Sequence, residues 1–364
     1  MKKILALMLT LVMVFSLTAC GGAASSATAP ESNAAAPAAD GAKPVSTEQP
    51  IAGVCWYNFA DTFIANARTT LNKVAADGGR VKIIDADSQN DIAMQTNNIN
   101  NFYTQDINYM IINNINVNAK PEMIEQAKAK GIPLIFANTD SPTEEEFAMY
   151  DKVYHVSSAA EQSGTIIGEQ IVKYWKENPS ADRNGNGKLD YVMLLGVQQH
   201  YDTQVRAKFS VEAIQAAGIE VNLVQESICN YQRSDAQNQM ASILQARKGD
   251  VEAVIACNDD MALGAIEALK AANFFKDKAS FIPVVGVDAT VVGVEALQEG
   301  MLLGTALNNP VILGNAIYNL IELLEDGKEL TQESIGMEGV RVEGHHIYID
   351  YIGITADNVA DATY

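Results

Sequence analysis

Hydrophobic and polar residues follow two alternating patterns from residue 51 to the end of the chain. Short runs of β-branched and apolar residues, typical of buried strands, alternate with longer segments whose apolar residues recur every three or four positions, as in amphipathic helices. The predicted strands are 51–57, 81–85, 109–112, 133–137, 153–156, 191–195, 220–225, 253–256, 283–287 and 301–306. The predicted helices are 62–76, 92–103, 121–130, one that ends at 175, 203–217, 234–246, 261–271, 291–298 and 311–325, and 340–351 is expected to be extended.

This alternation predicts the fold class. Alternation of strands and helices along the chain is typical of parallel sheets covered by helices on both faces. Two runs of the pattern meet near residue 150, and the chain is long enough for two ordinary domains. We therefore expect an α/β protein with two Rossmann-like, doubly wound parallel sheets.

The first fifty residues have a different composition. Lys2 and Lys3 precede an apolar run at 4–17 that is short for a membrane span, and small residues follow it, so 1–20 is predicted to be a signal peptide. The ending Leu-Thr-Ala-Cys resembles a lipobox, in which Cys20 becomes the lipidated first residue of the mature protein; an ordinary secretory signal with a chance cysteine is the alternative. Residues 21–50 are rich in Ala, Ser and Pro and are predicted to form a disordered tether.

Charge and cysteine content exclude several classes of protein. The net charge of −20 opposes binding to nucleic acid or to anionic lipid through the general field, so membrane attachment would depend on the lipid. Without Cys20, three cysteines remain. This number is odd, and their spacing matches neither a disulfide framework nor a zinc motif. Cys55 and Cys257 lie in apolar strands and are expected to be buried free thiols.

A polar loop at 182–190 carries oxygen-bearing side chains at EF-hand spacing. Its sixth residue is glycine, as the sharp turn requires, and its seventh can offer a backbone carbonyl. The twelfth place is Met193 instead of Glu, so the loop is half of a calcium site that needs a carboxylate from elsewhere; a plain Asn-Gly surface turn is the alternative. The candidate ligands are Asp182, Asn184, Asn186, Lys188 through its carbonyl, and Asp190.

Polar and aromatic residues follow many of the predicted strands. In open α/β sheets, ligands bind at the carboxyl ends of the strands. Side chains that donate and accept hydrogen bonds suit sugar hydroxyls, and flat rings suit the C–H faces of a pyranose. The predicted sugar-binding residues are Asp61, Phe63, Asn113, His200, Asp202, Arg206, Tyr231, Asn258, Asp288 and Asn308.

Five segments resemble the galactose/glucose-binding proteins of ABC transport systems, which are type I periplasmic binding proteins. They are 83–91 (IIDADSQND), 196–202 (GVQQHYD), 257–264 (CNDDMALG), 286–289 (GVDA) and 304–308 (GTALN). The resemblance implies hexose binding by the residues just named, with Tyr231 standing where the family has Trp. It also implies a structural Ca²⁺ in the 182–190 loop, completed by Glu252, with Asn186 and Asp190 in place of the family's Asp and Gln.

The resemblance implies a multi-crossing hinge between the domains, with crossings near 156–158, 309 and 344. The N-terminal lobe would be 51–157 with 310–343, and the C-terminal lobe 158–309 with 344–364, carrying the calcium loop. Together these features predict a lipid-anchored, extracytoplasmic, monomeric binding protein that closes on a D-glucose- or D-galactose-class monosaccharide and delivers it to an ABC permease.

Several alternatives remain open at this point. The same fold could report sugar occupancy to a chemoreceptor or a sensor kinase, or form the core of a sugar-responsive repressor, although no basic DNA-binding segment is present. A glycosidase using Asp259 and Asp260 is a further alternative, but these residues fit a helix N-cap better. His200 could be a solvated loop residue, and His345 and His346 would point to opposite faces of a strand. We expect no enzyme activity.

Overall fold

A computed structural model describes residues 49–363 of the chain. The predicted signal peptide, the lipidation site Cys20 and nearly all of the predicted tether lie outside the described residues. Within the described part, no helix has the length and apolar character needed to cross a bilayer.

The first lobe is built on a seven-stranded sheet with the order β11-β12-β5-β4-β3-β1-β2. All neighbouring pairs are parallel except β11 with β12. Its strands are β1 Ile51–Trp56, β2 Lys82–Asp87, β3 Tyr109–Ile112, β4 Leu134–Ala137, β5 Val153–Ser158, β11 Val340–Glu343 and β12 His346–Ile349. Its helices are α1 Thr62–Gly78, α2 Ile92–Tyr103, α3 Lys120–Lys130, α4 Glu144–Ala148, α10 Pro310–Glu325 and α11 Gln332–Ile335.

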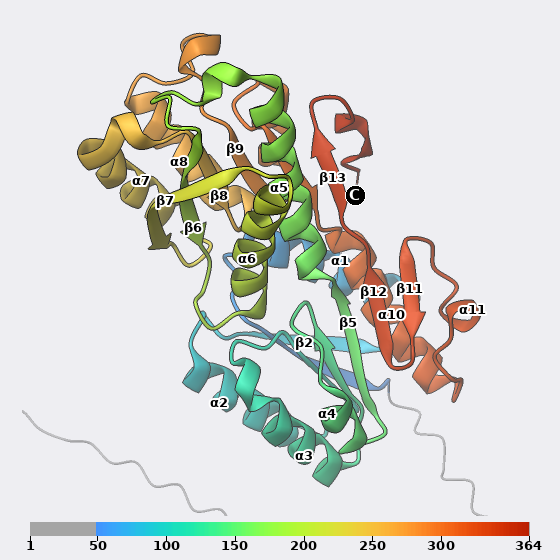
Figure 1. Ribbon diagram of the computed structural model, residues 1–364. Coiled ribbons are helices and arrows are strands. Elements are labelled where there is room, and N and C mark those ends of the chain that lie inside the picture. The colour runs from blue at the N-terminus through green and yellow to red at the C-terminus, as the bar shows by residue number, and fades with distance from the viewer. Residues whose placement is uncertain (1–48, 364) are drawn as a thin grey trace, which may run out of the picture. The chain divides into compact units, whose positions relative to one another are not determined.

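The second lobe is built on a six-stranded sheet with the order β13-β10-β9-β8-β6-β7, in which only β13 runs antiparallel to its neighbour. Helix α5 packs against α6, and α7 against α8 (Figure 1). The strands are β6 Lys188–Leu195, β7 Glu220–Ile228, β8 Ala253–Ala256, β9 Val284–Asp288, β10 Gly304–Leu307 and β13 Ile352–Thr355. The helices are α5 Ala160–Glu177, α6 Tyr201–Ala216, α7 Arg233–Arg247, α8 Asp259–Ala271 and α9 Val291–Gln298.

The two parallel sheets confirm the predicted fold class. Every residue of β3, β4, β8, β9 and β10 is buried, which explains why these strands appear in the sequence as continuous apolar runs rather than alternating ones. Cys55 and Cys257 are fully buried free thiols, as expected, and Cys229 is a third.

The chain passes between the lobes at three places. Ser158 ends β5 and Ala160 begins α5; two asparagines separate β10 from α10; and two residues separate β12 from β13. Because α10 packs against α1 and β5, and α5 packs against β9, β10 and β13, each crossing carries the chain from one sheet to the other.

One predicted lobe boundary is wrong. The expected extended segment 340–351 is a hairpin: Gly344 adopts a φ of 57° at the turn, and β12 pairs with β5 in the first sheet. Residues 344–349 therefore belong to the first lobe, and the third crossing lies at Asp350 and Tyr351 instead of near Gly344. The hairpin lies beside α10 in Figure 1.

Candidate functional site

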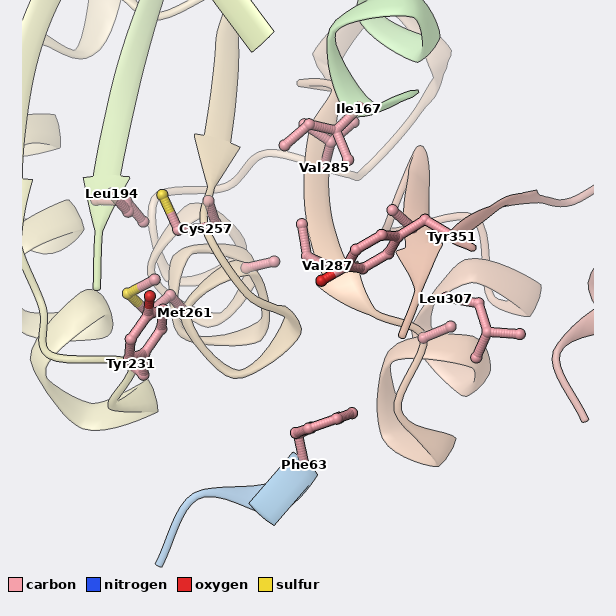
Figure 2. Close-up of a cluster of buried hydrophobic side chains, with 14 of the residues drawn as sticks. Phe63, Ile167, Leu194, Tyr231, Cys257, Met261, Val285, Val287, Leu307 and Tyr351 are labelled. Carbon is pink, nitrogen blue, oxygen red and sulfur yellow. The ribbon is translucent and has the colours of Figure 1, made fainter. Parts of the chain in front are cut away.

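One cavity lies between the carboxyl ends of the two sheets, and all ten predicted sugar-binding residues line it. They come from both lobes and from the ends of seven different strands or the segments that follow them. Figure 2 shows Phe63, Tyr231 and Tyr351 on three sides of a cluster of buried hydrophobic side chains, and the first two of these residues also line the cavity. The cavity is lined by Asp61, Phe63, Asn113, His200, Asp202, Arg206, Tyr231, Asn258, Asp288 and Asn308, together with six residues discussed below.

Hydrogen bonds orient two polar cavity residues of the first lobe. Asp61 is the N-cap of α1 and accepts a hydrogen bond from the backbone N–H of Ile64 at 2.9 Å. Asn113 follows β3, and its Nδ2 donates to the carbonyls of Ala137 at 3.1 Å and Asn138 at 2.7 Å. Both side chains are buried, so their orientation is set before any ligand arrives.

Arg206 is the central cation of the second-lobe wall. Its Nη2 donates to Asp202 Oδ2 at 2.9 Å and to the Tyr351 hydroxyl at 3.0 Å, and its Nη1 donates to the Cys257 carbonyl at 2.9 Å. Burial by itself lowers the pKa of Arg206, but Tyr351, Asp202 and Asp288 around it raise the pKa well above its usual value. The guanidinium therefore stays charged inside the cavity.

Burial shifts the other titratable groups toward their neutral forms. It raises the pKa of Asp288 well above its usual value and also raises the pKa values of Asp61 and Asp202. Burial and then the charge of Arg206 lower the pKa of His200 to about 4. His200 is only 9% exposed, so it is a neutral imidazole in the cavity wall and not a solvated loop residue.

Three buried polar atoms of the cavity residues lack a hydrogen-bond partner among the residues the structure describes. They are His200 Nε2, Arg206 Nε and Asn308 Nδ2. Because an unpaired buried polar group costs free energy, such atoms are expected where a ligand supplies the missing partner. These three atoms belong to residues of one cavity, which is compatible with a ligand rich in hydrogen-bonding groups.

Six cavity residues were not predicted from the sequence. Asn114, Asn138 and Thr139 follow β3 and β4 directly, so the strand-end rule would have found them had it been applied to every strand. Tyr57 lies just beyond β1, and its ring meets the ring of His200 edge-on at 4.8 Å. The remaining two are Ile64 and Tyr201.

The predicted calcium loop is folded around Asp182, Asp190 and Glu252. Glu252 is buried, and its two carboxylate oxygens accept from the backbone N–H groups of Arg183 at 2.6 Å and Asp190 at 3.0 Å. Glu252 thus contacts Asp190 of the loop directly, although the two residues are 62 positions apart in the sequence.

The side chains within the loop converge on one carboxylate. Asp190 Oδ2 accepts from the Nδ2 atoms of Asn184 at 2.6 Å and Asn186 at 2.8 Å. Asp182 accepts from backbone N–H groups of Gly185, Asn186 and Gly187. All six predicted ligand residues therefore belong to one small cluster, which includes the backbone of Lys188, whose N–H donates to Asn186.

Other candidate residues have structural contacts. Asn258, not Asp259, is the N-cap of α8, and Asp259 and Asp260 lie in its first turn. His345 hydrogen-bonds the Val153 carbonyl, whereas His346 stacks on Tyr348. Within residues 49–363, no group of three or more His, Cys, Asp or Glu side chains is arranged to hold a metal ion by itself.

Comparisons with known proteins identify relatives across the folded body. The family model of the periplasmic binding protein domain matches residues 51–329. The D-galactose/methyl-galactoside binding periplasmic protein of Haemophilus influenzae is 33% identical over 312 residues, covering 85% of this chain and 90% of the relative. The putative rhizopine-binding protein of Rhizobium meliloti is 28% identical over 306 residues, covering 83% and 89%.

Solved structures have the same architecture. A solute binding protein of an ABC transporter from Bacillus halodurans, with bound myo-inositol, is similar with a TM-score of 0.69 and 25% identity, covering 87% of this chain and 98% of that one. These relatives are binding proteins and not enzymes, in agreement with the absence of a catalytic motif in the sequence. The chain therefore belongs to the periplasmic binding protein family, as the sequence resemblance implied.

Proposed function

We propose that this protein captures a monosaccharide of the D-glucose or D-galactose class in the cavity between its lobes and delivers it to an ABC permease. The observation that carries the proposal is the set of unpaired buried atoms on His200, Arg206 and Asn308, three residues of a cavity lined by carboxyl and amide side chains. A sugar hydroxyl donates and accepts at once, so it can pair with each of these groups.

The electrostatics of the cavity suit a neutral polyol. The charged Arg206 guanidinium can donate hydrogen bonds to sugar hydroxyls, and such charge-assisted bonds are stronger than neutral ones, about 1.5–3 kcal/mol each against about 1. The aromatic rings of Phe63 and Tyr231 enter from different lobes and are available to cover the faces of a pyranose. A ligand without matching hydroxyls would leave the buried groups unpaired and would be rejected.

Hinge closure follows from the position of the cavity between two lobes joined by three short crossings. Ligand binding favours the closed form only through its better fit to that form. The galactose-binding relative from Haemophilus influenzae supports the hexose assignment, and the inositol-bound structure from Bacillus halodurans makes cyclic polyols a necessary comparison.

The proposal includes attachment outside the cytoplasm through a lipid on Cys20. The basic residues, apolar run and lipobox-like ending of the first twenty residues support it, and the Ala/Ser/Pro-rich segment that follows would let the body stand off from the membrane. The alternative function, signalling of sugar occupancy to a chemoreceptor or a sensor kinase, uses the same closed form.

The proposal also includes a structural Ca²⁺ held by Asp182, Asn184, Asn186, Asp190, Glu252 and the Lys188 carbonyl. The donor set is oxygen-rich, as calcium requires. Backbone hydrogen bonds tie Glu252 to Arg183 and Asp190, and no described contact bonds a Lys or Arg side chain to Asp182, Asp190 or Glu252, which leaves negative charge for a cation to balance. A flip of the side-chain amides of Asn184 and Asn186 would place their oxygen atoms, instead of their nitrogen atoms, next to the Asp190 carboxylate.

A thermal-shift panel tests the sugar assignment. The folded body would be heated with D-galactose, D-glucose, D-ribose, L-arabinose and myo-inositol, because a ligand that binds only the native state stabilises it by about 4 kcal/mol at a thousand times Kd. D-galactose or D-glucose is expected to give the largest rise in Tm. A flat response to both, with a rise for another compound, would replace the hexose assignment with that compound.

A further inference from the structure

The turn after β9 carries the cavity residue Asp288 in an unusual backbone conformation. Asp288 has a φ of 111° and Ala289 a φ of 50°, and both lie in the region that favours glycine. Strained residues of this kind persist only where the surrounding structure holds them in place. The contacts of this turn therefore decide where the Asp288 carboxylate points.

One buried carboxylate, that of Asp259, hydrogen-bonds to both Thr290 and Thr305, the two residues that hold the turn in place. Its Oδ2 accepts from the backbone N–H of Thr290 at 2.7 Å and from the Thr290 hydroxyl at 3.2 Å. Its Oδ1 accepts from the Thr305 hydroxyl at 2.7 Å, and that hydroxyl in turn accepts from the backbone N–H of Ala289 at 3.2 Å. Of the two amides that follow Asp288, that of Thr290 thus bonds to Asp259 directly, and that of Ala289 is connected to it through the Thr305 hydroxyl.

The surrounding glycines make room for this carboxylate. A Cβ atom on Gly286 would lie 2.4 Å from Asp259 Oδ1, and one on Gly293 would lie 2.3 Å from Oδ2. Gly293 also donates its backbone N–H to the Thr290 hydroxyl at 3.1 Å, which caps α9. The pocket for the carboxylate is therefore formed by the same segments that carry the turn.

Asp259 does not itself line the cavity, and it is fully buried. Its side chain bonds to Thr290 and Thr305 instead of capping its own helix, because Asn258 is the N-cap of α8. Asp259 is the first residue of α8 and directly follows the cavity residue Asn258, and its side chain contacts the turn that carries the cavity residue Asp288. A purely local helix-capping role does not account for these contacts.

We propose that Asp259 is a positioning residue that holds Asp288 in its ligand-facing conformation through Thr290 and Thr305. The inference rests on the proposed sugar-binding function of the cavity. We call the hydrogen bonds of Asp259 with Thr290 and Thr305 the brace. The inference predicts that loss of the brace weakens sugar binding through Asp288 and not through general loss of the fold.

The test measures Kd for D-galactose and D-glucose by calorimetry, with Tm recorded for each variant. Thr305→Val keeps the side-chain shape and removes the hydroxyl that joins Asp259 to Ala289, whereas Thr305→Ser keeps that hydroxyl. Asp259→Ala removes the whole brace. We expect Thr305→Val and Asp259→Ala to weaken binding at least tenfold, and Thr305→Ser to stay within about twofold of the wild type.

A double-mutant cycle separates positioning from a general effect. In an Asp288→Asn background, Thr305→Val is expected to change Kd less than twofold, because the group that the brace positions has already been altered. Equal weakening in both backgrounds, or wild-type affinity in Thr305→Val, would overturn the inference. If Asp259→Ala does not fold, the comparison of Thr305→Val with Thr305→Ser is sufficient to test the inference.

The outcome also distinguishes this inference from the proposed function. A wild-type protein that binds neither sugar would refute the hexose assignment and the inference with it. Wild-type binding that depends on Asp288 but not on Thr305 or Asp259 would refute only the inference.

Discussion

The Thr62 hydroxyl in the first lobe donates a hydrogen bond to Asp260 Oδ2 in the second lobe at 2.6 Å, although 198 residues separate the two in the chain. Thr62 begins α1, between the cavity residues Asp61 and Phe63. Asp260 lies in the first turn of α8, and its other oxygen accepts from Arg233 Nε at 3.1 Å. The bond therefore joins the lobes beside the proposed ligand site.

Removal of this bond is expected to destabilise the closed arrangement. Thr62→Val should weaken sugar binding about fivefold, because a partly exposed hydrogen bond to a carboxylate contributes about 1 kcal/mol, and most of the change should be a faster dissociation rate. Surface plasmon resonance with immobilised protein measures both rates. Thr69→Val is the matched control, since the Thr69 hydroxyl bonds only to the Ala65 carbonyl in its own helix among the described contacts. Identical kinetics in the two variants would show that the bond has no part in closure.

Gly196 is expected to set the position of the Tyr231 ring. A Cβ atom at this residue would lie 2.1 Å from Tyr231 Cζ, and the Tyr231 hydroxyl is held by Thr203 at 2.7 Å. Gly196→Ala should therefore displace the ring and raise the Kd for the hexose at least tenfold, measured by calorimetry. Gly249→Ala is the control because a Cβ there meets nothing within 4 Å. Unchanged affinity in Gly196→Ala would mean that the ring does not contact the sugar.

Removal of the proposed calcium is expected to lower the stability of the second lobe. Burial raises the pKa of the Glu252 carboxyl, and the nearby charge of Asp190 also raises it, so a bound cation would relieve this cost. EDTA should reduce Tm in the wild type, and added Ca²⁺ should restore it, because a ligand of the native state stabilises that state. Glu252→Gln should be insensitive to EDTA, and Asp277→Asn, an exposed carboxylate in another loop, should respond as the wild type does. A wild type that ignores EDTA contradicts the calcium assignment.

The buried His155 is expected to make stability depend on pH. Burial lowers its pKa to about 4, against 6.5 for the ordinary side chain, and its Nε2 lies 2.9 Å from the Thr139 carbonyl. Between these two values the native state binds fewer protons than the unfolded state, so this contribution to stability is lost as the pH falls from about 6.5 to about 4. The loss amounts to about 3 kcal/mol at most.

The contribution of His155 can be isolated by difference. The buried carboxyls of Asp61, Asp202 and Asp288 have raised pKa values and act in the opposite direction, but they are present in both proteins compared. Chemical denaturation of the wild type and His155→Gln at pH 7, 5.5 and 4.5 should give a difference that shrinks with falling pH. A difference that is constant across this range would show that His155 keeps its ordinary pKa in the native state.

Much of the fold could be predicted because the spacing of apolar residues along the chain indicates most of its strands and helices. Strands such as β8 and β9 are uninterrupted apolar runs, and helices such as α1 and α10 have apolar residues at regular spacing, so both types of element were recognisable without tertiary information. The ten predicted cavity residues come together because parallel strands bring their carboxyl ends to one edge of each sheet.

The hairpin at Gly344 shows where local patterns are insufficient. The segments on either side have the same β-branched character, so the sequence did not indicate that β12 would pair with β5 in the first sheet. Asn138 and Thr139, by contrast, directly follow β4, so the strand-end rule applied to every strand would have included them.

The order of residues thus sufficed for the two sheets, the strand-end chemistry and the family, since each of these depends on neighbours in the chain or on a general rule of parallel sheets. The contact of Thr62 with Asp260 and the bracing of the Asp288 turn by Asp259 emerged only from the folded molecule. They depend on the separation of side chains far apart in sequence, and that separation is set by how the helices and sheets pack against one another.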